Sequence, residues 1–451
     1  MSQPSPNVLV GIGALINNNH TIHRKRKKDL GILELVAIAL GGMVGGGIFT
    51  ILGVSVSMVG VYTPVAIILG GGIASLAAYS YVKLGVYYRD EGATYSFFKR
   101  TYPHSSRAAS LIGWWVVFGY ICTLALYAYT FAAYAISGTS FADSDLMRKV
   151  VAGLCIAIFA LINIWSVKGM GKLEDLLVYS KLLILVMISF VLVYNSNASV
   201  PQLLEANGPF PFMGILIVAS VTFVAYEGFQ LVIHAVDEMD DPARNIPRAI
   251  YTAIGVAITI YIVIALGAIV AIPFDDIIAN KEYALASGAG KVLGHWGNDL
   301  VVFGALLATS SAISGTLFGA SRLMAIIAGD GYFPKPLAKR ENRIPTRAII
   351  TMSVAAMFLV ASGGLQLILK FGSITFLLVS FLMAIANHKM RRETHSSSFL
   401  TVAAMIVLAS ATLLIVYYVA TTEIDQLVFI ICLYALVSGA SWLYAKTGAA
   451  L

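Results

Sequence analysis

The feature that most constrains this chain is a succession of long apolar segments separated by short polar connectors. Each segment runs for about 20 residues, the length that a helix needs to cross the hydrocarbon core of a bilayer. The segments therefore predict an all-α membrane protein with about twelve transmembrane helices. Their approximate limits are 31–58, 63–85, 108–137, 149–167, 176–195, 210–236, 248–272, 298–325, 346–364, 371–388, 399–419 and 425–445.

The composition agrees with this class and excludes an ordinary soluble fold. Of the 451 residues, 59% are hydrophobic and only 12% are charged, whereas soluble domains carry charges on about a quarter of their residues. So few charges cannot cover the surface of a soluble protein of this size. We expect one membrane-embedded bundle without a separate soluble module, preceded at 1–29 by a polar, disordered cytoplasmic tail that is no signal peptide.

The distribution of basic residues predicts the orientation. With the N-terminus inside the cell, 24 of the 30 lysines and arginines fall on the cytoplasmic side, five fall outside, and Lys181 stays within a span. The positive-inside rule describes this asymmetry, and an even number of spans places both termini in the cytoplasm. The basic cluster at 24–28 is then a topology signal facing anionic lipid. The net charge of +7 therefore does not indicate a nucleic-acid partner.

Two predicted spans contain residues that interrupt a helix. The first span carries five glycines within 41–47, and the sixth carries Glu227 and Gly228 near its middle. Glycine lets the backbone leave helical geometry, and irregular backbone inside a membrane is tolerated only where it is buried in protein or lines a cavity. Two inverted five-helix repeats would place matched breaks in these two spans, and secondary transporters bind substrate at such breaks. Close helix packing is the alternative explanation for the glycines.

Four motifs within residues 30–330 carry a family resemblance. They are the glycine-rich run GGGIF at 45–49, the segment YSYVKLGVYYRDEGATYSF at 79–97, the stretch VYSKLLIL at 178–185, and FVAYEGFQ at 223–230 with its acidic and Pro-Arg-Ala tail from Glu238 to Ala249. Together they resemble the amino acid–polyamine–organocation superfamily of transporters. The stretch at 178–185 is similar to archaeal and bacterial proton-coupled amino acid transporters, which carry a lysine there.

The resemblance implies a fold and a function. The fold would be that of the leucine transporter, with five-helix repeats at 30–195 and 209–390, two additional helices at 398–446, and helices 1 and 6 unwound in mid-membrane. The function would be transport of an amino acid across the plasma membrane by alternating access, as a proton-coupled symport. Exchange of cationic amino acids or polyamines, and sodium-coupled symport, stay open as alternatives.

The two breaks supply groups that suit an amino acid. Free N–H groups at a half-helix N-terminus attract a carboxylate, and carbonyls freed in the sixth span accept from an ammonium. Aromatic side chains at the second break either cover the substrate as a gate or only pack. The expected substrate-binding residues are Gly45, Gly46, Gly47, Ile48, Phe223, Ala225, Tyr226, Glu227 and Phe229.

Lys181 is the candidate for proton coupling. A lysine inside a span is costly and by default functional, and burial disfavours its charged form, so that it could load and release a proton. In the family that the chain resembles, this lysine replaces a bound sodium ion between the first and eighth spans. The matching hydroxyls of span eight would be those of Ser310 and Ser311. The alternative is that Lys181 snorkels to the nearby interface.

Glu227 departs from the family pattern, because many relatives carry a neutral residue at this position. It is a counter-charge for a cationic substrate, a second proton site, or a carboxyl that only holds the break together.

Other classes of function lack the residues they need. The chain has no phosphate loop of the GxxxxGK[ST] type, so ATP does not drive transport. The three cysteines lie inside apolar segments without metal-ligand spacing, and no nucleophile–base pair indicates an enzyme. We therefore expect no cofactor and no metal site. The expected partners are an amino acid, protons and the lipid bilayer.

Overall fold

The computed structural model describes residues 30–165, 170–196, 200, 202, 210–280, 283–341 and 344–448. Within these ranges the chain is helical, and β-structure is limited to isolated bridges. The predicted tail at 1–29 lies outside the described residues. The helices are α1 (Ile32–Met43), α2 (Gly47–Val59), η1 (Gly60–Tyr62), α3 (Thr63–Tyr88), α4 (Ala93–Thr101), α5 (Ser106–Ile136), α6 (Asp145–Trp165), α7 (Met170–Tyr194), α9 (Phe212–Val221), η2 (Thr222–Tyr226), η3 (Phe229–Ala235), α10 (Pro242–Ala271), α11 (Phe274–Ala279), α12 (Ala284–Leu293), α13 (His295–Gly329), η4 (Lys335–Ala338), α14 (Thr346–Ser362), α15 (Leu365–Lys389), α16 (Ser398–Thr422) and α17 (Ile424–Gly448).

The described part of the chain contains nine helical stretches long and apolar enough to cross a bilayer, together with three shorter apolar helices. One of the nine, Gly47–Tyr88, is 42 residues long, about twice what one crossing needs. The helical direction changes within this stretch at Gly60, whose φ is +51°. Each of the twelve predicted ranges contains a helix. The predicted class, an all-helical multi-pass membrane protein, is thus confirmed.

Three short α-helices of the described part of the chain fall outside the predicted ranges, as do the 3₁₀ helices η1 and η4. α4 occupies part of the segment that the sequence placed in a loop after the second span, and α11 and α12 lie between α10 and α13. Their apolar residues are too few to form a block of membrane-spanning length, so hydropathy alone does not mark them. α4 nevertheless buries the rings of Tyr95 and Phe97 against the bundle.

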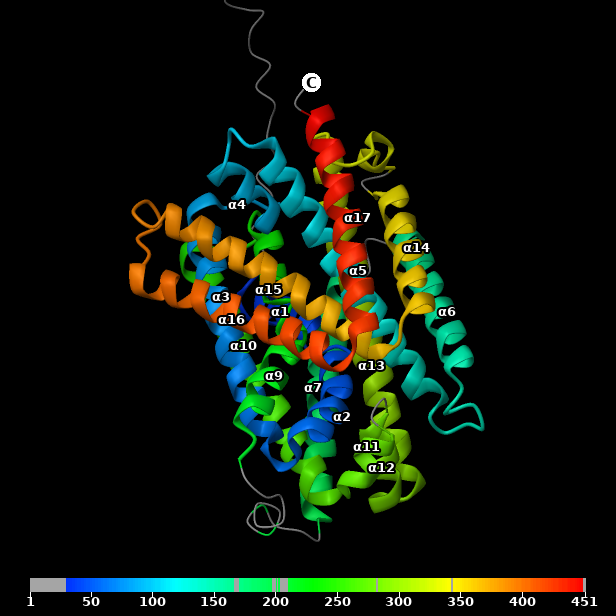
Figure 1. Cartoon of the computed structure of the whole chain (residues 1–451). Helices are drawn as coiled ribbons and strands as arrows, with labels where there is room; N and C mark the ends of the chain where they lie inside the picture. The colour runs from blue at the N-terminus through cyan, green and yellow to red at the C-terminus, as the bar shows by residue number, and fades with distance from the viewer. Residues whose placement is uncertain are drawn as a thin grey trace, which may run out of the picture.

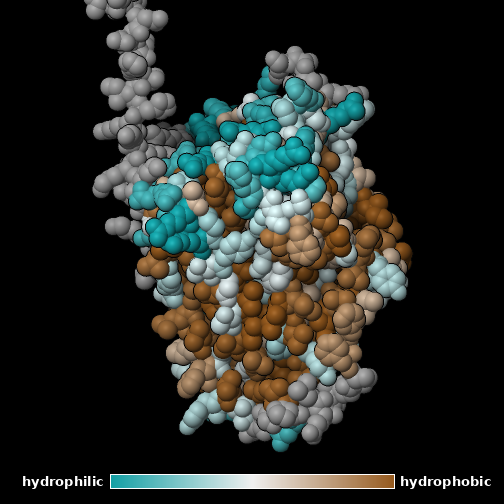
Figure 2. Space-filling view, turned by 90° about the vertical axis from the view of Figure 1, so that its left-hand side faces the viewer, coloured by the Kyte–Doolittle hydropathy of each residue, from teal (hydrophilic) through white to brown (hydrophobic). Residues whose placement is uncertain are grey.

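The bundle has a buried centre and a lipid-facing rim (Figure 1). The most apolar window of Phe212–Ala235 is 94% buried, whereas that of Ile424–Ala445 is 17% buried. The interrupted segment around η2 and η3 therefore lies at the centre, and α17 lies at the edge. On the face shown in Figure 2, a broad hydrophobic surface lies below a hydrophilic cap, as expected for a protein that meets lipid and water in layers.

Candidate functional site

The first predicted break is a real end of one helix and start of another. α1 ends at Met43, and α2 begins at Gly47. Between them, Val44 N donates to Leu40 O at 2.8 Å and Gly45 N donates to Met43 O at 3.0 Å. The N–H groups of the first turn of α2 have no intrahelical acceptor, as at any helix start. The sequence predicted that N–H groups at this position bind the carboxylate of a substrate.

The second break separates two stretches of 3₁₀ helix. α9 gives way at Thr222 to η2, the chain becomes extended at Glu227, and η3 starts at Phe229. Gly228 has a φ of +130°, a backbone conformation that residues with a side chain rarely adopt. A glycine is therefore required at this point. The sequence indicated the break because Gly228 follows the charged residue Glu227 within an apolar span.

The two breaks lie directly against each other. A Cβ atom on Gly228 would come within 2.6 Å of the carbonyl carbon of Gly42, and one on Gly47 within 2.9 Å of the Cβ of Ala225. These glycines thus serve close packing, which was the alternative interpretation. They also bring the two irregular backbones to one place, so packing and site formation are compatible here.

Side chains from three other helices satisfy the carbonyls at the end of α1. Helix ends leave such carbonyls without intrahelical partners. Three successive ones accept here: Gly41 O from Lys181 Nζ at 3.2 Å, Gly42 O from Tyr127 OH at 2.7 Å, and Met43 O from Tyr261 OH at 2.7 Å.

Tyr261 also connects the two breaks, because its hydroxyl lies 2.9 Å from Ala225 O as well as near Met43 O. Ala225 O was a predicted acceptor for the substrate ammonium. The one hydroxyl hydrogen of Tyr261 is shared between Met43 O and Ala225 O, so Ala225 O has a shared donor in this conformation. Sequence reasoning missed Tyr127 and Tyr261, since a tyrosine in an apolar span has no spacing that distinguishes it from a packing residue.

Lys181 lies where the family resemblance implied, between α1 and α13. Its side chain is fully buried, and Nζ lies 3.4 Å from Ser311 Oγ in addition to its bond with Gly41 O. A snorkelling lysine keeps its ammonium in water, so the burial disagrees with that alternative. Ser310, the other predicted hydroxyl, is half-buried at the preceding position of α13.

Glu227 is buried beside a small cavity. Its Oε2 accepts from Gln230 Nε2 at 2.7 Å, and Gln230 Oε1 in turn accepts from Gly228 N at 3.0 Å. Its Oε1 is buried and has no hydrogen-bond partner in the described part of the chain. The cavity has a volume of about 10 Å³, lies against Gly42 and Tyr127, and is the size of one water site.

The predicted aromatic residues pack in the core. Phe223, Tyr226 and Phe229 are all buried. Tyr226 OH donates to Ile67 O at 2.7 Å, and the ring of Phe229 lies edge-on to Tyr81 with centroids 5.3 Å apart. None of the three lines the cavity beside Glu227, whose aromatic lining comes from Tyr120, Tyr127 and Phe376. Ile48 is buried in the first turn of α2.

A comparison with known protein families identifies the group to which this arrangement belongs. A sequence model described as amino acid permease matches residues 30–440. The chain belongs to the amino acid permease family. The resemblance to the amino acid–polyamine–organocation superfamily is thereby confirmed, and this permease is a multi-pass membrane protein of a family of amino acid transporters.

Individual relatives cover most of the permease. It is 32% identical to the inner membrane transport protein YbaT of Escherichia coli, over 82% of this chain and 85% of the relative. It is 27% identical to an uncharacterized protein of Methanocaldococcus jannaschii, over 87% and 90% of the two chains. It is 28% identical to the rabbit (Oryctolagus cuniculus) large neutral amino acids transporter small subunit 2, over 78% and 68%.

Proposed function

We propose that this permease is a secondary active transporter that carries an amino acid by alternating access, in symport with a proton. The observation that carries the proposal is the buried amine of Lys181, which bonds both to the interrupted α1 at Gly41 O and to α13 at Ser311 Oγ. An amine in this position keeps both hydrogen bonds only while the end of α1 lies next to α13. The family membership supports an amino acid as the substrate.

The coupling follows from the chemistry of an amine. A protonated Lys181 donates to both partners and holds α7, α1 and α13 together. A neutral amine donates more weakly, because hydrogen bonds with a charged partner are about twice as strong as neutral ones. Release of the proton therefore loosens the end of α1, so that proton loading and the position of the first break depend on each other.

The substrate would bind between the two breaks. Its carboxylate would meet the N–H groups at the start of α2, near Gly47 and Ile48, where the helix dipole is positive. Its ammonium would take the place of the Tyr261 hydroxyl at Ala225 O, or bind the neighbouring carbonyl of Tyr226. A 10 Å³ cavity is far too small for an amino acid, so loading requires the surrounding helices to separate, as alternating access demands.

We also propose an architecture and an orientation in the membrane for this transporter. It comprises twelve transmembrane helices, inverted repeats at 30–195 and 209–390, two additional helices at 398–446, and both termini in the cytoplasm of a plasma-membrane protein. The Escherichia coli relative, named an inner membrane transport protein, supports the location. The excess of basic residues on one side supports the orientation.

Uptake into proteoliposomes tests the function. We expect accumulation of at least one neutral amino acid when the outside is more acidic, and loss of this accumulation in Lys181→Ala. Lys149→Ala is the matched control, because Lys149 pairs with Asp145 at the start of α6, away from the breaks. Uptake that requires sodium and ignores pH, or that occurs only with substrate preloaded inside, would contradict proton symport.

The unpartnered oxygen of Glu227 favours a second candidate function, exchange of cationic amino acids or polyamines. A buried carboxylate with an open position facing the site can accept from a substrate ammonium. In Glu227→Gln, a cationic substrate would lose at least tenfold in apparent affinity, while a neutral amino acid would be affected much less. A competition assay with lysine and leucine against a labelled substrate distinguishes the two cases.

A further inference from the structure

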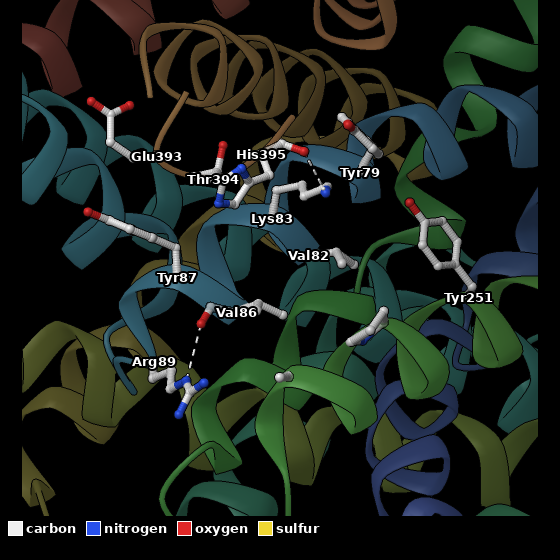
Figure 3. A pocket seen from close by; sticks show the side chains of 12 residues that line it. Tyr79, Val82, Lys83, Val86, Tyr87, Arg89, Tyr251, Glu393, Thr394 and His395 are labelled. Atoms are coloured by element: carbon white, nitrogen blue, oxygen red, sulfur yellow. Dashed lines mark hydrogen bonds between the residues drawn. The ribbon is translucent and has the colours of Figure 1, made fainter. Parts of the chain in front are cut away.

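A hollow of about 650 Å³ lies on the side of the bundle, away from the two breaks (Figure 3). It is enclosed by the end of α3, the start of α10, and the connection between α15 and α16. The hollow shares no lining residue with the cavity beside Glu227, so it is a separate feature of the surface.

Two cationic side chains of one helix end face this hollow. Lys83 is held by His395 O, to which its Nζ donates at 3.0 Å, and it lies over the ring of Tyr79. Arg89 turns back on α3 through a left-handed backbone, with φ +47°, and its Nε donates to Val86 O at 3.2 Å. These bonds occupy one donor of each group. The other donors of both groups have no hydrogen-bond partner within the described part of the chain, so they can meet an anion.

The other walls of the hollow are apolar and aromatic. Val82, Val86 and Pro247 are among the lining residues, and Tyr251 stands at one side. The Tyr251 residue is 39% exposed. Tyrosines with one apolar and one wet end are typical of the membrane–water interface. Below Tyr79, α3 continues with the half-buried side chains of Ile73 and Leu76, a surface that suits an acyl chain.

The balance of charge favours an anionic ligand. Glu393 is the one carboxylate among the lining residues, and in Figure 3 its side chain points away from Lys83. Figure 2 shows the side of the bundle that contains α3 and α10, where the hydrophilic cap meets the hydrophobic surface. A ligand at this boundary needs both a charged head and an apolar tail, which a free phosphate ion lacks.

We propose that this hollow binds an anionic phospholipid of the cytoplasmic leaflet, with its anionic head group in the part of the hollow lined by Lys83 and Arg89 and its acyl chains along α3. Basic pockets between helices on the cytoplasmic side are suited to such head groups. The tyrosines, valines and proline that line the hollow then contact the glycerol backbone. The site is independent of the transport mechanism proposed above.

Native mass spectrometry of the purified full chain tests the proposal, with phosphatidylglycerol or phosphatidylcholine added. We expect wild type to retain phosphatidylglycerol preferentially. Lys83→Gln and Arg89→Gln should each weaken this binding about fivefold, since a basic side chain near a membrane surface contributes about that factor. The double variant should retain the two lipids equally. The charge-conserving Lys83→Arg should keep the preference.

The control is the double variant Lys335→Gln, Lys339→Gln, which removes two exposed charges from η4 and the following residue, outside the hollow. It should leave lipid binding unchanged. If phosphatidylglycerol binding weakens equally in this control, the effect is a general attraction of the lipid to the basic surface, and the proposal is overturned. Displacement of the lipid by glycerol 3-phosphate at equal concentration would also overturn it, because the head group alone would then suffice. If the double variant does not fold, Arg89→Gln alone, which changes an exposed side chain, decides the outcome.

Discussion

At the scale of single residues, the end of α1 shows how a membrane protein stabilises an interrupted helix. Three successive carbonyls, at 41–43, depend on donors from outside the helix. Without them, those of Gly41 and Gly42 would be unpaired in a medium without water, at a cost of several kcal/mol each, and Met43 O would keep only its bond from Gly45 N. A lysine and two tyrosines donate to them from α7, α5 and α10. Because the donors are on different helices, the break persists only while those helices stay together. The same bonds therefore hold the break and make it sensitive to helix movement.

The first prediction concerns Gly228. We expect Gly228→Ala to destabilise the permease by about 3 kcal/mol, because the new Cβ both strains a left-handed backbone and meets the backbone of Gly42 at 2.6 Å. The measurement is the thermal unfolding midpoint of the purified protein. Gly72→Ala in α3 is the control, since its Cβ would meet nothing within 4 Å. A Gly228→Ala protein as stable as this control would show that the second break does not require glycine.

At the scale of elements, a short helix outside the predicted spans is joined to the end of a long one by polar contacts. α4 is tied to the end of α13 through Asp330, which accepts from Tyr95 OH at 2.7 Å and pairs with Lys99 Nζ at 2.8 Å. Burial, followed by the hydrogen bond with Asp330, raises the pKa of the Tyr95 hydroxyl. The hydroxyl is therefore a donor throughout the physiological pH range, and the tie does not depend on pH through Tyr95.

The second prediction concerns this tie. Asp330→Asn keeps a weaker acceptor for Tyr95 and removes the ion pair with Lys99. Since Asp330 and Lys99 are both partly exposed, the loss should be about 1 kcal/mol. Hydrogen exchange of Ala93–Thr101 should become about fivefold faster. Glu341→Gln, which removes an acid from an exposed pair with Lys339, should leave exchange in α4 unchanged, and an equal effect of both variants would rule out a specific tie.

At the scale of the whole molecule, α16 and α17 form a rim that packs on the bundle mainly through α15 and α5. Several polar contacts join this rim to the bundle, and one of them involves a buried charge. Lys370 of α15 is almost fully buried, and its Nζ lies 2.6 Å from Glu423, between α16 and α17. Gln426 Oε1 is 3.3 Å from the same nitrogen. The carboxylate of Glu423, in the connection between α16 and α17, thus compensates the positive charge of Lys370 on α15.

The third prediction follows from that compensation. Glu423→Gln should cost about 3 kcal/mol of stability, because it leaves the buried ammonium of Lys370 without its counter-charge. The double variant Lys370→Met, Glu423→Gln should recover most of the loss, since neither charge remains. Thermal unfolding of the two variants and of wild type gives the comparison. Equal destabilisation of single and double variants would mean that packing, and not charge compensation, anchors the rim.

The extent to which sequence predicted this protein differs between its parts. The class and the helical ranges were predictable. In lipid, the backbone N–H and C=O groups of a span must bond within the helix, and the side chains must be apolar, so each span is a continuous apolar segment. Both breaks were found from Gly45–Gly47 and Glu227. The position of Lys181 against α1 was available only through the family resemblance. α4, α11 and α12 were missed, because short helices stabilised by tertiary contacts leave no hydropathy signal.

The predicted site residues lie at the two breaks, where they make contacts that the sequence did not indicate. Phe223 and Phe229 pack in the core, and Ala225 O is already bonded to Tyr261. The unpartnered oxygen of Glu227 is a property of the surroundings, and no local pattern around Glu227 reveals it.

The sequence by itself determined the long helices, the two interruptions and the excess of basic residues on one side, because each is a local property of composition and spacing. Only the tertiary structure decided what completes the interruptions. Tyr127 and Tyr261 are 85 and 218 residues away from the carbonyls that they satisfy. A freed carbonyl inside a membrane needs a donor but does not specify which helix supplies it, so the partner is set by how the helices pack.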